Sequence, residues 1–477
     1  MLFNSVEFLL FFIVVYALYL VLSHTWQNRL LLVASCLFYA AWSWKFLFLM
    51  FASISVDFVC SQYIFRTQNP ARRRFFLCLS LFVNFSILGF FKYCNFFIEN
   101  LQSLLQSFSI SHPLLNSTLE IILPLGISFY TFEAISYVMD VYRSRTQPAK
   151  KYWDYVLFVI YFPHLIAGPI MRAKDFLPQI VLPRRLSLGQ FYEGCHLIFW
   201  GLFEKIFIAD NLAKIVNPVF AGAPPYKGGE VLVALYAFAF QIFCDFDGYS
   251  NMARGLGKCM GFEIAINFKL PYFSVNPKEF WQRWHITLSS WLRDYLYIPL
   301  GGNRGGIFKQ CASLFVTMLL GGLWHGASWT FVLWGAYHGI LVGLHRVILR
   351  FGGWKSVAEP GSQAGQAGGR ILKTIFFFHM VTIGWLLFRA TSLHQVGEMF
   401  YAMGNIFHEP GFWELFLQFS AIIGPLMIVQ YGQLKTGDLL FLFKTPKIVK
   451  IGVYALMTYL ILGFGVMRAE EFIYFQF

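Results

Sequence analysis

The segment VEFLLFFIVVYALYLVLSH, from Val6 to His24, decides the fold class of this chain. Apart from Glu7 it is uncharged, and it is long enough for a tilted helix to cross about 30 Å of hydrocarbon. A second such segment, IGVYALMTYLILGFGVM, lies at Ile451 to Met467. Hydrophobic residues make up 57% of the 477 residues and charged residues only 13%, which is not the composition of a soluble domain. The sequence predicts an all-α polytopic membrane protein.

The first segment has no basic residue before it and no small-residue cleavage pattern after it. We therefore expect a retained membrane span and not a signal peptide. The cysteines show no CxxC pairing, and they fall in or beside apolar segments. We interpret them as buried thiols that form neither disulfides nor zinc sites. They are Cys36, Cys60, Cys78, Cys94, Cys195, Cys244, Cys259 and Cys311.

The formal net charge of +13 could indicate a nucleic-acid partner, but the distribution of the basic residues argues against one. When the loop at Arg29 is placed in the cytoplasm and sides alternate from there, most of the 37 Lys and Arg residues fall in cytoplasmic loops. The exceptions are Lys45, Lys92, Lys205, Lys214, Lys227, Arg389 and Arg468. This asymmetry predicts a multi-pass membrane protein with both termini outside, in contact with lipid and not with nucleic acid.

The apolar pattern predicts about ten or eleven spanning helices and no separate soluble domain. We divide the chain into N-terminal spans at 1–120, a central core at 121–350, a flexible cytoplasmic linker at 351–370 and C-terminal spans at 371–477. The linker carries the small-residue stretch EPGSQAGQAGG. We find no internal repeat, which argues against the inverted-repeat plan of many transporters.

Two regions depart from a simple crossing pattern. Residues 152–172 are apolar but lie between basic loops and contain prolines, so we expect this element to enter and leave on the same side. Residues 276–304 begin with Asn276 as a helix cap, Pro277 in the first helical position and Glu279 three residues after the cap. We expect an amphipathic or re-entrant helix there. Such elements are tolerated at membrane depth only beside protein or water, so they predict a cavity open to the cytoplasm.

The stretch GGLWHGASW, Gly321 to Trp329, places His325 at the end of an apolar run. An ionisable side chain within a span is a functional candidate, although many only bond a backbone carbonyl. Here the glycines allow close approach of backbones or a substrate, and Trp324 and Trp329 form an apolar wall. Burial favours the neutral imidazole, the form that a general base requires.

Two further histidines are candidates. In one continuous helix, Trp281, Trp284, His285, Leu288 and Leu292 would share a face. His285 then either faces the same cavity as His325 or is solvated on an interfacial helix. His338, in LWGAYHG, is either a partner or a packed core residue. No short-spaced ligand pair supports a zinc site, so we assign no metal. We expect intramembrane carboxylates such as Asp245 to form structural ion pairs.

Several long motifs resemble the membrane-bound O-acyltransferase superfamily, in particular its bacterial polysaccharide and alginate O-acetylation branch. The resemblance rests first on FWQRWHITLSSWLRDYLYIPLGGNR and LWHGASWTFVLWGAYHG. It extends to LPLGISFYTFEAISYVMDVYR, YFPHLIAGPI and QIFCDFDGYSNMARGLGKCMGFE, in the order of that branch. It runs from about Leu123 to His338 and implies a helical bundle with re-entrant elements around a central cavity.

The resemblance also implies residue roles. His325 falls on the essential catalytic histidine of the family's WHG motif, and His285 falls on the upstream histidine of a WRRWH-like helix, where Gln282 replaces the usual arginine. His338, Trp324 and Asp294 are expected to be supporting residues. Cytoplasmic cations would bind the phosphates of an acyl donor. Those we expect to do so are Lys278, Arg283, Arg293 and Arg304.

The expected activity is transfer of an acetyl group from a cytoplasmic thioester, acetyl-coenzyme A or another acyl thioester, to a hydroxyl acceptor for extracytoplasmic polysaccharide. No bound cofactor is expected. The family implies a periplasmic SGNH-type acetyltransferase or a polysaccharide-secretion complex as partner. The alternatives are D-alanyl transfer to teichoic acid from a carrier-protein thioester, and a non-enzymatic transporter in which His325 gates or relays protons.

Overall fold

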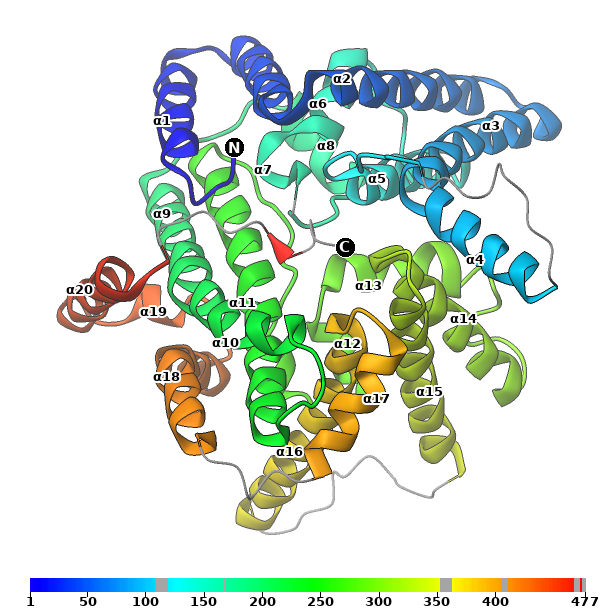
Figure 1. Ribbon diagram of the computed structural model, residues 1–477. Coiled ribbons are helices and arrows are strands. Elements are labelled where there is room, and N and C mark those ends of the chain that lie inside the picture. The colour runs from blue at the N-terminus through cyan, green and yellow to red at the C-terminus, as the bar shows by residue number, and fades with distance from the viewer. Residues whose placement is uncertain (109–118, 167, 352–362, 405–410, 467–471, 474–477) are drawn as a thin grey trace. The chain divides into compact units, whose positions relative to one another are not determined.

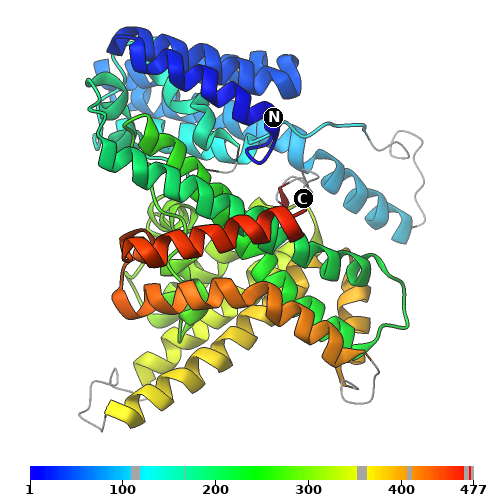
Figure 2. The same ribbon diagram turned by 90° about the vertical axis from the view of Figure 1, so that its left-hand side faces the viewer.

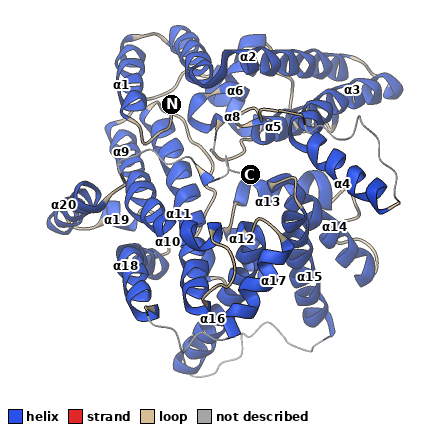
Figure 3. Ribbon diagram, viewed as in Figure 1, coloured by secondary structure: helices blue, strands red, loops and turns tan. Residues whose placement is uncertain are grey.

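The computed structural model describes the whole chain except residues 109–118, 167, 352–362, 405–410, 467–471 and 474–477. The described residues form helices joined by turns and loops, and no strand is drawn among them (Figure 3). Eight described helices are long and apolar enough to cross a membrane. They span His24–Arg66, Pro70–Ser107, Gly228–Cys259, Ile307–His325, Trp329–Phe351, Gly368–Arg389, Phe412–Thr436 and Lys447–Phe464. The prediction of an all-α polytopic membrane protein is confirmed.

The predicted number of spans, ten or eleven, differs from eight because two kinds of helix are counted differently. Helix α2, His24–Arg66, contains non-helical backbone at Ser43 (φ −159°, ψ 113°) and so joins two predicted spans in one 43-residue element. Other predicted spans coincide with shorter helices, such as α1 at Val6–Val21 and α5 at Ile127–Tyr142. With 16 residues each, α1 and α5 are shorter than any of the eight spans.

The chain divides into two compact units, and the first comprises Met1–Cys195 with Ala253–Ala265. In it, α2 packs against α3, α5 and α6. Its core is aromatic: Tyr137 and Tyr155 stack at a centroid distance of 4.2 Å, and both are buried. After α1 and α2, the helices wholly in this unit are α3 Pro70–Leu88, η1 Gly89–Tyr93, α4 Cys94–Ser107, α5, α6 Tyr152–Ile160, α7 Phe162–Leu165 and α8 Ala173–Val181.

The predicted re-entrant element at 152–172 is interrupted in the structure, because α6 ends at Ile160 and α7 begins at Phe162 with Pro163 in its first turn. Within the first unit, His164 Nε2 lies 3.3 Å from the Glu133 carboxylate, and the Met171 amide donates to the other carboxylate oxygen at 2.7 Å. Both side chains are buried. Whether this element enters and leaves on one side of the membrane stays a prediction.

The second unit comprises His196–Met252 and Ile266–Phe477. Helices α9, Leu188–Leu202, and α11, Gly228–Cys259, contribute to both units. Figure 1 shows α14 and α15 side by side, and in the view of Figure 2 the C-terminal helices α18 (orange) and α20 (red) run in similar directions. The other elements of this unit are η3 Phe203–Ala209, α10 Asp210–Ala221, η4 Pro271–Phe273, α12 Pro277–Arg283, α13 Ile286–Leu292, η5 Arg293–Tyr297, α14 Ile307–His325, α15 Trp329–Phe351, α16 Gln363–Arg389, α17 Leu393–Ala402, α18 Phe412–Thr436, α19 Phe441–Lys444 and α20 Lys447–Phe464.

Two local predictions need correction. The cysteines are free thiols, as expected, but only Cys60, Cys244 and Cys259 are buried, whereas Cys78 and Cys195 are exposed on apolar helices. The predicted linker at 351–370 lies largely outside the described residues, and its last part, from Gln363, is already helical in α16.

Candidate active site

The element that carries His285 starts as predicted but does not continue as one helix. The Asn276 side chain accepts from the Glu279 amide at 2.9 Å, and the Glu279 carboxylate accepts from the Val275 amide at 3.0 Å. Helix α12 then stops after Arg283, because Trp284 has an extended backbone and His285 is left-handed (φ 40°, ψ 56°). The prediction that Trp281 to Leu292 share one helix face is therefore wrong.

Contacts from the preceding loop hold this break in place. The Ile286 amide donates to the Asn267 carbonyl at 2.9 Å, and the Lys269 amide donates to the Arg283 carbonyl at 2.9 Å. The Asn267 side chain accepts from the Thr287 hydroxyl at 2.6 Å. A left-handed non-glycine residue costs roughly 1–2 kcal/mol, and such strain persists where surrounding contacts overdetermine it. His285 thus becomes the residue that caps α13.

His285 is fully buried among aromatic rings. Its ring lies 4.6 Å from Phe246 and 6.1 Å from Trp324, centroid to centroid. Burial lowers the pKa of His285 to about 3. The interpretation of a solvated histidine on an interfacial helix is therefore wrong, and the imidazole is neutral at physiological pH.

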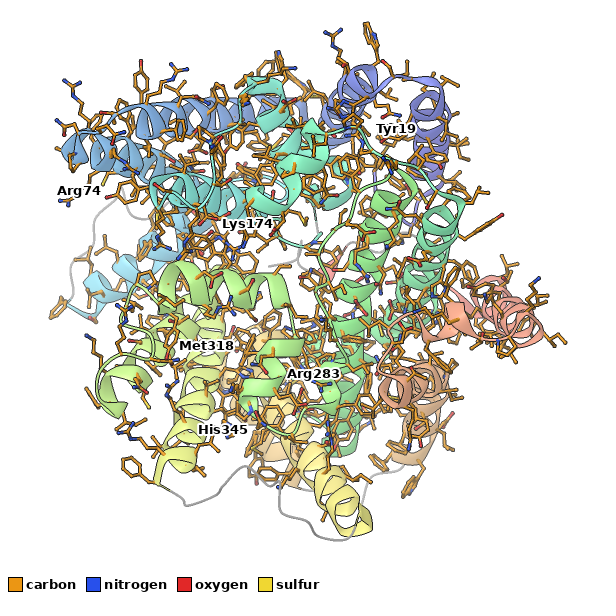
Figure 4. All side chains as sticks on the ribbon, turned by 180° about the vertical axis from the view of Figure 1, so that it is seen from behind. Tyr19, Arg74, Lys174, Arg283, Met318 and His345 are labelled. Carbon is orange, nitrogen blue, oxygen red and sulfur yellow. The ribbon has the colours of Figure 1, made fainter. Side chains whose placement is uncertain are left out.

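His325 is the last residue of α14, and close helix packing sets its position. An ideal Cβ on Gly322 would lie 2.3 Å from the Phe331 carbonyl oxygen, and one on Gly326 would lie 2.1 Å from the Phe331 ring. An ideal Cβ on Gly335 would lie 2.4 Å from the Met318 carbonyl oxygen. These glycines let the backbones of α14 and α15 meet. Met318, on α14, is labelled in Figure 4.

An alternating series of imidazole and indole rings connects the three predicted histidines. Trp324 lies 6.1 Å from His285 and 5.0 Å from His325, and Trp334 lies 5.0 Å from His325 and 4.9 Å from His338, all between ring centroids. All five side chains are buried. The structure therefore brings His325, His285, His338 and Trp324 together in the second unit. We call His285, Trp324, His325, Trp334 and His338 the histidine–tryptophan series.

His338 joins this series to the 276–304 element. Its ring is parallel to Phe280 (7°, 6.2 Å) and lies edge-on to Trp281 at 5.2 Å. An ideal Cβ on Gly384 of α16 would lie 2.8 Å from His338 Nε2, so only glycine leaves room for the imidazole there. His338 is thus packed between α12 and α16.

The predicted donor-binding cations are not part of this series. Arg283, labelled in Figure 4, forms an ion pair with Glu279 at 2.7 Å. Arg293 pairs at 2.8 Å with Asp294, the predicted supporting carboxylate, and its side chain is 62% exposed. Lys278 and Arg304 are exposed. None of these ion pairs involves the three histidines.

Trp334 and a polar network around Arg346 were not among the predicted site residues. Arg346 donates to Gln310 and Asn303 at 2.8 Å each and so stabilises the glycine-rich loop before α14. The four-residue spacing of Trp334 and His338, which puts them on one face of a helix, was the available signal. The contact of Trp334 with His325 depends on how α14 and α15 cross, which no local pattern reveals.

The predicted structural ion pairs include a buried triad. Lys205 Nζ lies 2.8 Å from both Asp210 and Asp245, and all three side chains are buried. The second oxygen of Asp245 accepts from the Ile473 amide at 2.7 Å. Lys205 is therefore an internal ion-pair partner and not an outward loop cation. In the described part of the chain, no group of three His, Cys, Asp or Glu side chains is placed to hold a metal ion.

These features define a class: a polytopic helical membrane protein with a buried, aromatic-lined histidine site. Residues 150–387 match the model of the MBOAT, membrane-bound O-acyltransferase family. The chain belongs to this family, and it is an O-acyltransferase. This excludes the alternative of a non-enzymatic transporter.

Three relatives illustrate the range of the family. The chain is 43% identical to the probable alginate O-acetylase AlgI of Pseudomonas putida over 87% of this chain and 82% of that protein. It is 35% identical to the peptidoglycan O-acetyltransferase of Helicobacter pylori, over 83% and 78%. It is 30% identical to the teichoic acid D-alanyltransferase of Streptococcus thermophilus, over only 48% and 58%.

Proposed function

We propose that this protein is a membrane O-acetyltransferase that moves an acetyl group from acetyl-coenzyme A to a hydroxyl acceptor for extracytoplasmic polysaccharide. The observation that carries the proposal is the histidine–tryptophan series, which holds His325 beside the indole rings of Trp324 and Trp334. The chain also belongs to a family of O-acyltransferases. The names of the relatives favour acetyl over D-alanyl transfer, because the alginate relative covers 87% of the chain and the D-alanyl relative only 48%.

In this proposal His325 is the general base. Its imidazole takes the proton of the acceptor hydroxyl as the oxygen attacks the thioester carbonyl carbon, and the thiolate then leaves with that proton. Burial lowers the pKa of His285 to about 3, so its imidazole is neutral. In this proposal it donates a hydrogen bond to the oxyanion that forms from the thioester carbonyl.

The donor's phosphates are proposed to bind the cations of the 276–304 element. Lys278 and Arg304 are exposed and can reach a phosphate. Arg283 and Arg293 are already paired with Glu279 and Asp294, although the Arg293 side chain stays 62% exposed. In the proposed orientation these residues face the cytoplasm and both termini lie outside, in the bacterial inner membrane. A periplasmic SGNH-type acetyltransferase or a polysaccharide-secretion complex would receive the product.

The test uses the full-length protein in lipid nanodiscs with [1-¹⁴C]acetyl-coenzyme A and an alginate oligosaccharide. We expect coenzyme A release that depends on the acceptor, and radiolabel in the oligosaccharide. A D-alanyl carrier-protein thioester, with lipoteichoic acid as acceptor, serves as the competing pair. Transfer from that pair, with none from acetyl-coenzyme A, would establish the D-alanyl alternative and overturn the acetyl proposal.

A further inference from the structure

Trp334 contacts three parts of the predicted site. Its ring lies 5.0 Å from His325 and 4.9 Å from His338, and it meets Trp281 of the 276–304 element at 5.8 Å. The side chain is 1% exposed. Trp334 thus touches the proposed base, a second histidine and the element that carries the donor-binding cations.

The indole N–H of Trp334 has no hydrogen-bond acceptor among the residues that the structure describes. A buried indole N–H can only donate, and leaving such a donor unsatisfied destabilises the folded protein. Tryptophans in protein interiors usually find an acceptor for this group. A buried donor in contact with a catalytic histidine is therefore suited to an acceptor that arrives with the substrate.

We propose that the indole N–H of Trp334 binds the carbonyl oxygen of the acyl thioester beside His325. This inference rests on the proposed acyl transfer and adds a residue that touches the substrate. A thioester carbonyl oxygen only accepts hydrogen bonds, so it complements an indole that only donates. Trp334 thereby also selects an acyl donor over a thioether of the same shape.

The same contact acts during the reaction. When the acceptor oxygen forms its bond to the carbonyl carbon, the carbonyl π electrons move to the oxygen, and the hydroxyl proton passes to His325. The bond from the Trp334 N–H strengthens as this oxyanion develops. The oxyanion then re-forms the carbonyl, the carbon–sulfur bond breaks, and the thiolate takes the proton from His325.

Two other indole N–H groups are buried and unsatisfied within the described residues, namely those of Trp281 and Trp385. Both contact Trp334, at centroid distances of 5.8 and 6.1 Å. Among the described residues, the ring of His325 contacts Trp324, Trp334 and Phe388 and neither of these two. Trp334 is therefore better placed than Trp281 or Trp385 to reach a carbonyl that reacts at His325.

The test compares Trp334→Phe, which keeps an aromatic ring and removes the N–H, with Trp200→Phe. Trp200 is a matched control, because it is buried in the same unit and its ring contact is with Phe203. Each protein, in nanodiscs, is assayed for transfer from acetyl-coenzyme A and for inhibition by S-ethyl-coenzyme A, which has a CH₂ in place of the carbonyl. We expect Trp334→Phe to lower kcat by on the order of 100-fold. Its inhibition constant for S-ethyl-coenzyme A stays within about twofold of wild type.

A merely structural role would weaken both acetyl transfer and S-ethyl-coenzyme A binding, so parallel losses contradict the inference. Full activity of Trp334→Phe contradicts it as well and leaves the proposed function standing. Wild-type protein that transfers nothing from acetyl-coenzyme A overturns both proposals. If Trp334→Phe does not fold, infrared spectra of wild-type protein with ¹³C-carbonyl acetyl-coenzyme A decide. A carbonyl band lowered from its position in buffer supports the bond, and an unshifted band overturns it.

Discussion

His285 and His325 both contact the indole ring of Trp324, at centroid distances of 6.1 and 5.0 Å. They reach it from different elements, since His325 ends α14 whereas His285 caps the short helix α13. Trp324 therefore couples the position of the left-handed His285 to that of the proposed base. Within the second unit, this contact connects the 276–304 element to the WHG motif.

The first prediction concerns His325. Replacement by alanine is expected to lower acceptor-dependent coenzyme A release on the order of 10³-fold, because general base catalysis contributes about 10² to 10⁴. The thermal midpoint is expected to fall as well, because His325 is buried and its loss leaves a cavity, so activity is compared at a temperature where both proteins are folded. His394→Ala is the control, because His394 is 78% exposed and pairs only loosely, at 3.8 Å, with Glu398. Retained activity in His325→Ala would remove this residue from the mechanism.

The second prediction concerns stability in acid. Burial lowers the pKa of His285 from the ordinary histidine value of 6.5 to about 3 in the folded protein. Between these pH values the unfolded chain binds a proton that the folded protein does not. The free energy of unfolding therefore falls as the pH is lowered from about 6.5 towards 3. One such group contributes up to about 1.4 kcal/mol per pH unit in this window. His285→Gln should therefore show a flatter decline than wild type.

The measurement for His285 is the thermal midpoint in detergent at several pH values from 4 to 8. His394→Gln is the control and is expected to follow the wild-type profile, since this histidine is exposed. The prediction depends on the difference in slope between His285→Gln and wild type. Equal slopes for the two proteins would mean that His285 is protonated in the folded state.

The sequence predicts much of this architecture, because its signals are local. Apolar length identifies the helices, and Asn276 with Glu279 marks the start of α12. The break at Trp284 and His285 is not local, since it depends on bonds from Asn267 and Lys269, far back along the chain. Helical periodicity assumes that a helix continues, so it gave a shared face that does not exist. The role of Trp334 was missed for the same reason, because it depends on the crossing of α14 and α15.

The third prediction concerns that crossing. An alanine at Gly322 would place its Cβ 2.3 Å from the Phe331 carbonyl oxygen, a backbone atom that cannot move without displacing α15. Overpacking of this kind costs about 1–3 kcal/mol or more. We expect Gly322→Ala to lower the thermal midpoint and to reduce activity, because His325 lies one turn further along α14.

Gly343→Ala is a matched control for Gly322→Ala on the same pair of helices. Its ideal Cβ lies 3.8 Å from the Cys311 side chain, an ordinary van der Waals contact. It should therefore leave the midpoint unchanged or raise it slightly, because alanine favours a helix over glycine. Equal effects of the two substitutions would show that the close approach at Gly322 is not what limits stability.

The fourth prediction concerns the buried triad. Lys205→Met would leave Asp210 and Asp245 without the ammonium that lies 2.8 Å from each of them. Removing one member of a buried ion pair costs about 3–5 kcal/mol, because an uncompensated charge remains. We expect a strong loss of folded protein, measured as the thermal midpoint and as the monodisperse fraction after extraction.

Neutralising the whole triad separates charge from shape. In Lys205→Met combined with Asp210→Asn and Asp245→Asn none of the three charges of the triad remains, and replacing complete buried ion pairs by neutral groups is often nearly neutral for stability. The triple variant should therefore recover most of the midpoint lost in Lys205→Met. Lys227→Met is the surface control: its partner Glu230 lies at 2.8 Å but Lys227 is 61% exposed, so a cost of about 1 kcal/mol or less is expected. A triple variant no more stable than Lys205→Met would show that the lysine stem, and not its charge, supports η3 and α11.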